Sequence, residues 1–173
     1  MPDPTDPTPL VTRLDDAPVE GELDGDHYGA FYKVLTPHMR ARGGKLGLVW
    51  NRVPPGRAAC PAHTHRLEDE VFLILSGHGT LRYGAHRRPL QAGDCVSCPA
   101  GAGVAHQIVN THPSEDLIYL AAGNREPDEI CTYPDSGKVM VRGLGVGRLE
   151  RTAYMEGEPE RPLVLDEAGS AAP

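Results

Sequence analysis

The sequence predicts an all-β fold of the sandwich or barrel type, and three observations support this prediction. First, short apolar segments recur at intervals of about 8–12 residues with turn residues between them, which is typical of β-sandwiches and barrels. Second, the chain contains 20 glycines and 17 prolines among 173 residues, too many for a helical bundle. Third, 39% of the residues are hydrophobic, which is enough for one core, and the length suits one domain.

The expected strands lie in the middle of the chain, and each ends at a turn signal. Leu46–Trp50 is a short apolar segment closed by a Pro-Pro-Gly turn, and Val71–Leu75 ends just before Gly77. Residues 27–42 are compatible with either a short helix or a strand. The other segments with strand character are 80–83, 86–90, 95–98, 106–110, 117–121 and 138–142.

Both ends of the chain are expected to lie outside the barrel. Residues 1–26 form an acidic, proline-rich arm that we predict to be mobile, residues 27–150 form the barrel domain, and residues 151–173 form an acidic tail. The formal net charge of −7 resides in these two ends, whereas the middle is mildly basic with scattered bases. Because a nucleic-acid-binding protein needs a concentrated basic face, the sequence argues against a nucleic-acid partner.

The sequence also predicts a cytoplasmic protein that does not cross a membrane. The longest apolar stretch, residues 117–122, has six residues, far fewer than the roughly 20 that a spanning helix needs. The N-terminus has neither the basic start nor the apolar stretch of a secretory signal. Cysteines in this compartment are expected to be reduced. Cys95 and Cys98 have CxxC spacing, but a strand directs positions three apart to opposite faces, which argues against a redox or zinc pair.

The most informative feature is a set of three histidines and one glutamate. His63 and His65 are two residues apart, so on a strand both imidazoles point to the same face. Glu70 lies five residues beyond His65, and only a bend over the charged residues 66–69 brings its carboxylate to that face. His106 lies in a second glycine-rich segment. Three imidazoles and a carboxylate form a mixed nitrogen–oxygen site that suits Fe, Mn, Ni, Cu or Zn.

These residues resemble the two sequence motifs of the cupin superfamily. The first motif reads Gly56-x6-His63-x-His65-x4-Glu70-x6-Gly77, and the second reads Gly93-x5-Pro99-x-Gly101-x4-His106-x3-Asn110. Compared with the usual cupin motifs, the first motif has six instead of five residues between Gly56 and His63. The second motif has four instead of two residues between Gly101 and His106. The second difference disappears if Gly103 takes the role of Gly101. Neither difference removes a candidate ligand.

The resemblance implies a double-stranded β-helix, or jelly-roll barrel, flanked by disordered or extended N- and C-terminal arms. It further implies one divalent transition metal inside the barrel, with His63, His65, Glu70 and His106 as its ligands. Asn110 is implied to have a structural role. The identity of the metal does not follow from the ligand set.

The function that the resemblance favours is a metal-dependent enzyme acting on a small oxygenated organic molecule. Dioxygenase-type chemistry comes first, because related cupins with this ligand set include dioxygenases and oxalate-degrading enzymes. Four protein ligands leave up to two positions on an octahedral ion for other ligands, and Glu70 is expected to accept a proton as well. Two alternatives remain open: a sensor that binds a small ligand without turnover, and a metal that only stabilises the barrel.

Two further expectations concern the pocket and the assembly. Phe72 and Ile108 share strand parity with Glu70 and His106, so they are predicted to line the substrate pocket; the alternative is that they belong to the ordinary core. Exposed edge strands need a cover, and the resemblance implies that the proline-rich arm extends across a partner, because jelly-roll cupins commonly dimerise through added edge strands. The sequence therefore predicts a homodimer.

Overall fold

The computed structural model describes residues 10–164 and confirms the all-β fold. Within these residues there are fourteen strands and one short helix, α1 (Pro37–Ala41). Each of the segments expected to be a strand overlaps one. The strands are β1 (Leu23–Asp24), β2 (Tyr28–Gly29), β3 (Phe31–Val34), β4 (Leu46–Val53), β5 (Thr64–His65), β6 (Glu70–Ser76), β7 (His78–Tyr83), β8 (His86–Gln91), β9 (Cys95–Cys98), β10 (His106–Val109), β11 (Leu117–Asn124), β12 (Ile130–Tyr133), β13 (Lys138–Val141) and β14 (Gly145–Gly147).

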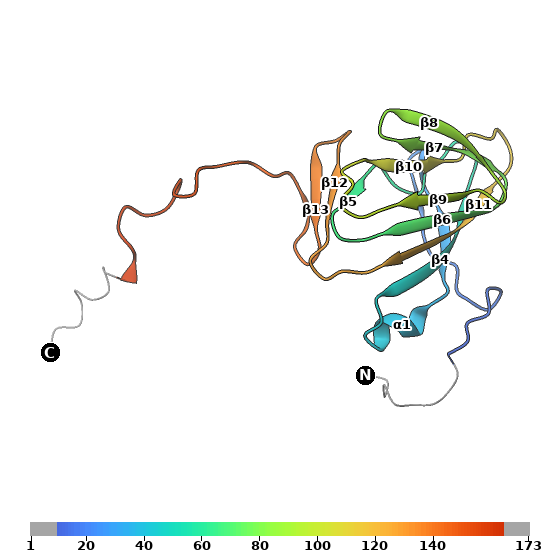
Figure 1. Ribbon diagram of the computed structural model, residues 1–173, viewed down its shortest axis with the longest axis horizontal. Coiled ribbons are helices and arrows are strands. Elements are labelled where there is room, and N and C mark those ends of the chain that lie inside the picture. The colour runs from blue at the N-terminus through green and yellow to red at the C-terminus, as the bar shows by residue number, and fades with distance from the viewer. Residues whose placement is uncertain (1–9, 165–173) are drawn as a thin grey trace.

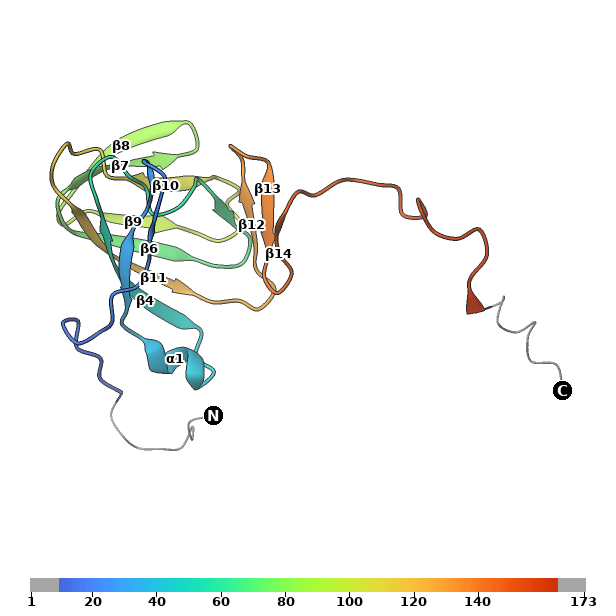
Figure 2. The same cartoon turned by 180° about the vertical axis from the view of Figure 1, so that it is seen from behind.

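The strands form the two facing layers of a double-stranded β-helix (Figure 1). One layer is a five-stranded sheet in the order β3-β4-β11-β6-β9. The other layer contains a three-stranded sheet, β10-β7-β8, and a four-stranded sheet, β14-β13-β12-β5. An isolated antiparallel bridge between His63 and His106 joins these two sheets, because His63 directly precedes β5 and His106 begins β10. Figure 2 shows the same arrangement from behind.

The core lies between the layers, and β6 shows how the sequence positions it. Phe72 and Ile74 point inward and are buried, whereas the alternating neighbours Val71 and Leu73 point outward and are each 39% exposed. The buried hydrophobic cluster consists of Ala30, Val53, Phe72, Ile74, Leu90, Val96, Cys98, Ile108, Leu117 and Tyr119. Both layers therefore contribute to one core.

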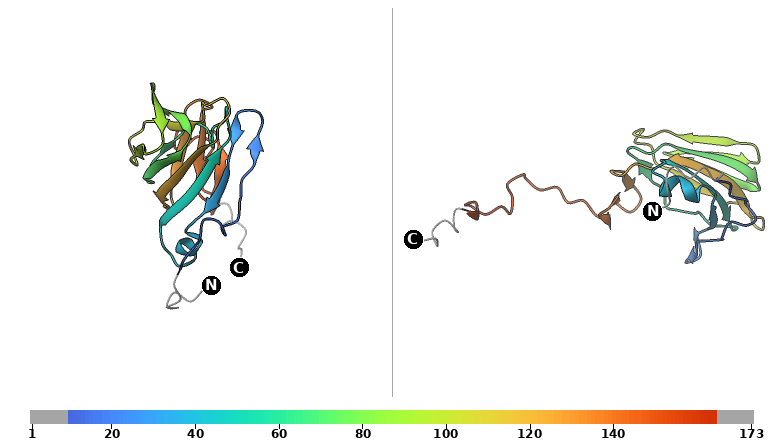
Figure 3. Two further views of the ribbon diagram at one scale, coloured as in Figure 1. Left: turned by 90° about the vertical axis from the view of Figure 1, so that its right-hand side faces the viewer. Right: turned by 90° about the horizontal axis from the view of Figure 1, so that it is seen from below.

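The described part of the N-terminal arm contacts the barrel. Glu20 pairs with Tyr32 of β3, and β1 pairs with β2 in a hairpin that spans the boundary predicted at residue 26. Residues 148–164 run away from the barrel (Figure 3). Residues 1–9 of the predicted arm and 165–173 of the predicted tail lie outside the described residues, so the division into arm, barrel and tail stays a prediction.

None of the helices in residues 10–164 has the length and apolar character that a membrane-spanning helix requires.

Asn110 links β4 to the turn that follows β10. Its side chain is fully buried, and its Nδ2 donates to the carbonyl oxygens of Val53 and Glu115, both at 2.8 Å. Its Oδ1 accepts the backbone N–H of His112 at 3.0 Å. An amide is needed here because it both donates and accepts.

We expect Asn110→Ala to lower the free energy of unfolding by about 3 kcal/mol, because it removes a buried hydrogen bond to Val53 and two partly buried ones to Glu115 and His112. Urea denaturation followed by circular dichroism measures this loss. Asn51→Ala is the matched control, because the Asn51 side chain makes one hydrogen bond of 3.3 Å, to Val49, and its removal should cost less than about 1 kcal/mol. Equal losses for the two variants would contradict the structural role of Asn110.

Candidate metal centre

The structure brings together the four residues that the sequence singled out. His63 and His106 exchange two backbone hydrogen bonds, of 3.1 and 2.9 Å, which places their side chains next to each other. His65 follows in β5, and Glu70 begins β6 in the opposite layer. Residues 66–69 form the expected bend between them, and this bend restores the direction of the Glu70 side chain toward the histidines.

The donor atoms of these side chains converge on one point. Oε2 of Glu70 lies 2.9 Å from Nε2 of His106, 3.1 Å from Nε2 of His65 and 3.7 Å from Nε2 of His63. The Nε2 atoms of His63 and His65 are 3.0 Å apart. Two ligands at right angles and about 2.1 Å from an ion are separated by about 3.0 Å, so three of these distances fit neighbouring positions of an octahedron. The residues therefore fit a divalent metal.

The outer nitrogens of two histidines are held so that their inner nitrogens face this point. Nδ1–H of His63 donates to the carbonyl oxygen of Pro61 at 2.9 Å, which leaves the Nε2 lone pair directed toward the cluster. Nδ1 of His65 lies 3.4 Å from Sγ of Cys131 and 3.3 Å from Oε1 of Glu129. Two lone pairs only 3.0 Å apart repel each other, so the His63–His65 pair needs a cation or a proton between its rings.

Without a metal, protons supply that positive charge. Burial lowers the pKa of His63, but hydrogen bonds with Cys60 and Glu70 offset this and raise the pKa to about 11. Burial likewise lowers the pKa of His65, and contacts with Cys131 and Glu70 raise it to about 10. For Glu70, burial raises the pKa, but hydrogen bonds from the three imidazoles lower it well below its usual range. The 3.0 Å separation leaves room for one hydrogen between the two rings, so the pair holds at least one proton at neutral pH.

Behind His65 lies a buried acidic layer that the sequence did not reveal. Glu129 is fully buried and accepts the backbone N–H groups of Arg66 and Leu67 at 2.7 and 2.8 Å. Glu68 accepts two hydrogen bonds, of 2.6 and 2.7 Å, from the guanidinium of Arg142. A carboxylate behind a ligating histidine fixes its tautomer and ring orientation. The β-branched and aromatic residues of β12, which directly follow Glu129, indicate a strand there but not where the Glu129 carboxylate lies.

We expect Glu129→Gln to weaken metal binding by about 10–100-fold, because it removes the negative charge that holds His65 in place. Competition with a coloured chelator measures the affinity, and thermal unfolding of the metal-free protein reports separately on stability. Glu150→Gln, on the exposed C-terminal segment, is the control. Unchanged affinity in a folded Glu129→Gln protein would show that His65 is oriented by other contacts.

The two residues predicted to line the substrate pocket also face the interior. Phe72 and Ile108 are buried, and the Phe72 ring centroid lies 5.8 Å from that of His106. Their role in substrate binding stays a prediction. Cys95 is exposed and Cys98 is buried on the opposite face, as expected for a strand. Burial, with a smaller contribution from Glu70, raises the pKa of the Cys98 thiol to about 12, so this thiol is protonated at neutral pH.

A second group of potential ligands, on the surface, is less suited to a metal. It consists of His78, His112 and Glu115. Nδ1 of His112 accepts the backbone N–H groups of Ser114 and Glu115 at 3.3 and 3.0 Å, so its Nε2 bears the proton in the neutral ring. The inner cluster is therefore the better candidate.

The comparisons with known proteins agree with this fold and site. Residues 49–123 match the family model for the cupin domain. The chain is 31% identical over 121 residues to auxin-binding protein 4 of Zea mays, which covers 63% of this chain and 57% of that protein. It is 36% identical over 70 residues to the oxalate-binding protein of Thermotoga maritima, which covers 40% of this chain and 54% of that protein. The chain thus spans just over half the length of these relatives.

Among solved structures, a sugar phosphate isomerase of the cupin superfamily from Silicibacter pomeroyi is similar over most of both chains. It has a TM-score of 0.65 and 25% sequence identity, and the match covers 80% of this chain and 90% of that one. The two facing sheets, the pair of motifs and the matching family model lead to the same conclusion: the chain contains a cupin domain, matched over residues 49–123.

Proposed function

We propose that this protein is a metal-dependent enzyme acting on a small oxygenated organic molecule, with dioxygenase-type chemistry as the first reaction class. The observation that supports this most directly is the convergence of three imidazole nitrogens and the Glu70 carboxylate, with three donor separations of 2.9–3.1 Å. Four ligands at this spacing occupy four positions of an octahedral ion and leave two positions for a substrate. When bound, the ion would supply Lewis acidity toward a substrate oxygen or electrons to dioxygen.

The same spacing favours iron, manganese or nickel over zinc. Two ligands of a tetrahedral ion are about 3.4 Å apart at the same bond length, which is wider than three of the four separations. Copper prefers tetragonal geometry. We propose an ion that accepts octahedral coordination and one equivalent per chain.

Glu70 is proposed to act on protons as well as on the metal. Its side chain is 26% exposed, whereas the side chains of the three histidines are at most 11% exposed, so Glu70 is the most accessible member of the cluster. The three imidazoles hold its pKa low, so the carboxylate is ionised at neutral pH, and its action as a proton acceptor requires that substrate binding raise this pKa toward neutrality.

Non-oxidative chemistry is the second candidate, because the similar structure from Silicibacter pomeroyi is a sugar phosphate isomerase and one relative is an oxalate-binding protein. Binding without turnover and a purely structural metal are the remaining alternatives. The names of both proteins refer to anionic ligands.

The experiment that tests the proposal uses full-length protein reconstituted separately with Fe(II), Mn(II) and Ni(II). Each form is incubated with a panel of hydroxy acids, enediols and sugar phosphates. An oxygen electrode measures dioxygen consumption, and chromatography measures the loss of each compound. Dioxygen consumption coupled to loss of one compound supports dioxygenase chemistry, and substrate conversion without it supports the isomerase or lyase class. Binding without conversion for every metal and compound would overturn the enzyme proposal.

We also propose that the protein forms a homodimer through the outward side of the five-stranded sheet. Trp50, Leu120 and Leu73 lie side by side across β4, β11 and β6. Val71 and Leu75 extend this row along β6 and are 39% and 41% exposed. A strand that is apolar on both sides is typical of a sheet covered on both faces. We propose a second copy as the cover, because an apolar row without charges at its centre is complementary to itself about a two-fold axis.

Light scattering coupled to size-exclusion chromatography tests the dimer. The wild type should have twice the chain mass, and Leu73→Glu should be monomeric, whereas Val146→Glu, at an exposed position of β14, should leave the dimer intact. A monomeric wild type would overturn the proposal. The cytoplasmic location and the lack of a nucleic-acid partner stay predictions.

A further inference from the structure

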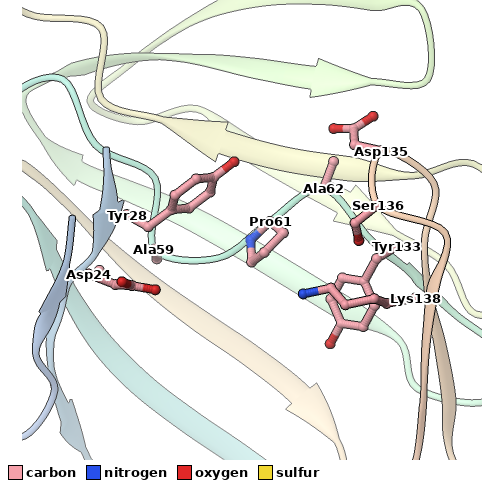
Figure 4. Close-up of a pocket in the computed structure, with 10 residues that line it drawn as sticks. Asp24, Tyr28, Ala59, Pro61, Ala62, Tyr133, Asp135, Ser136 and Lys138 are labelled. Atoms are coloured by element: carbon pink, nitrogen blue, oxygen red, sulfur yellow. The ribbon is translucent and has the colours of Figure 1, made fainter. Parts of the chain in front are cut away.

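A pocket among the described residues lies beside the candidate metal centre. Its volume is about 500 Å³, within the range of small-molecule sites. One wall is the β1–β2 hairpin, the other is the β12–β13 hairpin, and the segment before β5 crosses between them (Figure 4). The residues that line it are Asp24, Tyr28, Gly29, Ala59, Pro61, Ala62, Tyr133, Asp135, Ser136 and Lys138.

Two contacts connect this pocket to the metal centre. The ring of Tyr133, which lines the pocket, has its centroid 6.1 Å from that of His63. Pro61, another lining residue, accepts the Nδ1–H of His63. Two residues that line the pocket therefore contact the His63 imidazole directly.

One end of the pocket carries a positive charge. Lys138 is the only cationic residue among those that line it, and its Nζ lies 5.6 Å from the centre of the Tyr133 ring. Among residues 10–164, no carboxylate forms a salt bridge with Lys138. Asp135 is neutralised by Arg82, which donates two hydrogen bonds of 2.6 and 2.8 Å. The Lys138 end is thus positive.

The opposite wall has a different character. Asp24 and Tyr28 lie across the pocket from Lys138 (Figure 4). A carboxylate accepts hydrogen bonds from hydroxyl groups, and a phenol both donates and accepts. Apolar atoms of Ala59, Pro61 and Ala62 line the floor between the two ends. The pocket therefore offers a cation at one end and acceptors for hydroxyl groups at the other.

We propose that this pocket binds a small polyhydroxylated anion, with the carboxylate or phosphate group on Lys138 and hydroxyl groups on Asp24 and Tyr28. This assignment rests on the proposed function, because it places the substrate next to His63. A charged hydrogen bond of this kind contributes roughly 1.5–3 kcal/mol, which corresponds to a change in affinity of about 10–100-fold.

Calorimetric titration of the metal-free, full-length protein tests the assignment without requiring turnover. The probes are gluconate for a carboxylate, glucose 6-phosphate for a phosphate, and glucose and hexanoate as matched molecules that lack the charge and the hydroxyl groups. We expect saturable binding of at least one of the two polyhydroxylated anions, at least tenfold tighter than that of glucose or hexanoate. The probe with the higher affinity identifies the anionic group.

Variants at position 138 then separate charge from fold. Lys138→Gln should weaken binding of the anion at least tenfold, and Lys138→Arg should retain it within about threefold. Lys45→Gln is the control, because Lys45 pairs with Glu126 outside the pocket. Failure of both anions to bind, hexanoate binding equal to gluconate, or unchanged affinity in Lys138→Gln would overturn the assignment.

The same variants distinguish this inference from the proposed function. Anion binding that requires Lys138, in a protein that converts no compound with any metal, would support the pocket and overturn the enzyme proposal. Turnover of an anionic compound that is equally efficient in Lys138→Gln would overturn the pocket and leave the enzyme proposal in place.

Discussion

Replacement of Glu70 by alanine is expected to remove the metal from this protein. Glu70 supplies the only negative charge of the proposed ligand set, and its Oε2 lies within 3.7 Å of all three histidine Nε2 atoms. Outer residues that merely orient a ligand contribute about 10–100-fold to metal affinity, so loss of the anionic ligand itself should exceed about 100-fold. Elemental analysis after dialysis against a weak chelator should give about one metal per chain in the wild type and less than about 0.1 in the variant.

The control for this experiment is Glu115→Ala, which removes a glutamate from the surface group of His78 and His112. It should retain the metal in full. Glu70→Gln provides a second test in case the alanine variant folds poorly, because glutamine keeps the size of the side chain and loses only the charge. One equivalent of metal in either folded Glu70 variant would show that the four-residue assignment is wrong.

The sequence predicted most of the barrel because its signals are local. Strand β6 alternates between buried and exposed side chains with a period of two, and the turn that follows it contains Gly77. The same period places His63 and His65 on one face. Their meeting with Glu70 and His106 could be expected only from the resemblance to a family, since nothing local brings residue 106 next to residue 63.

The surroundings of the site were not predictable for the same reason. Glu129 is one of 24 acidic residues, and nothing in its sequence neighbours indicates that its carboxylate lies behind His65. Lys138 and Tyr28 are far apart in the sequence and line one pocket only because the β1–β2 and β12–β13 hairpins lie on either side of the same segment. Side chains that act together through tertiary packing leave no periodic pattern.

Metal uptake is expected to release at least one proton per ion at pH 7.5. In the metal-free protein the pKa values of His63 and His65 are raised to about 11 and about 10, so the pair is protonated at this pH. A metal ligand must be an unprotonated imidazole, so the ion and the proton compete for the same nitrogens. The carboxylate of Glu70 contributes no proton, because its pKa is lowered and it is already ionised.

The direction of the pH dependence follows from this competition. As the pH falls below about 10, the proton held by the pair opposes the metal more strongly, so affinity decreases by up to about tenfold per pH unit for each proton released. Calorimetric titration of the metal in two buffers with different ionisation enthalpies gives the number of protons directly. His78→Ala should not change that number, because His78 lies outside the cluster, whereas His63→Ala should lower it. A wild-type protein that releases no proton would mean that the His63 and His65 nitrogens are already free, and that charge repulsion between their lone pairs, 3.0 Å apart, is relieved by some other group.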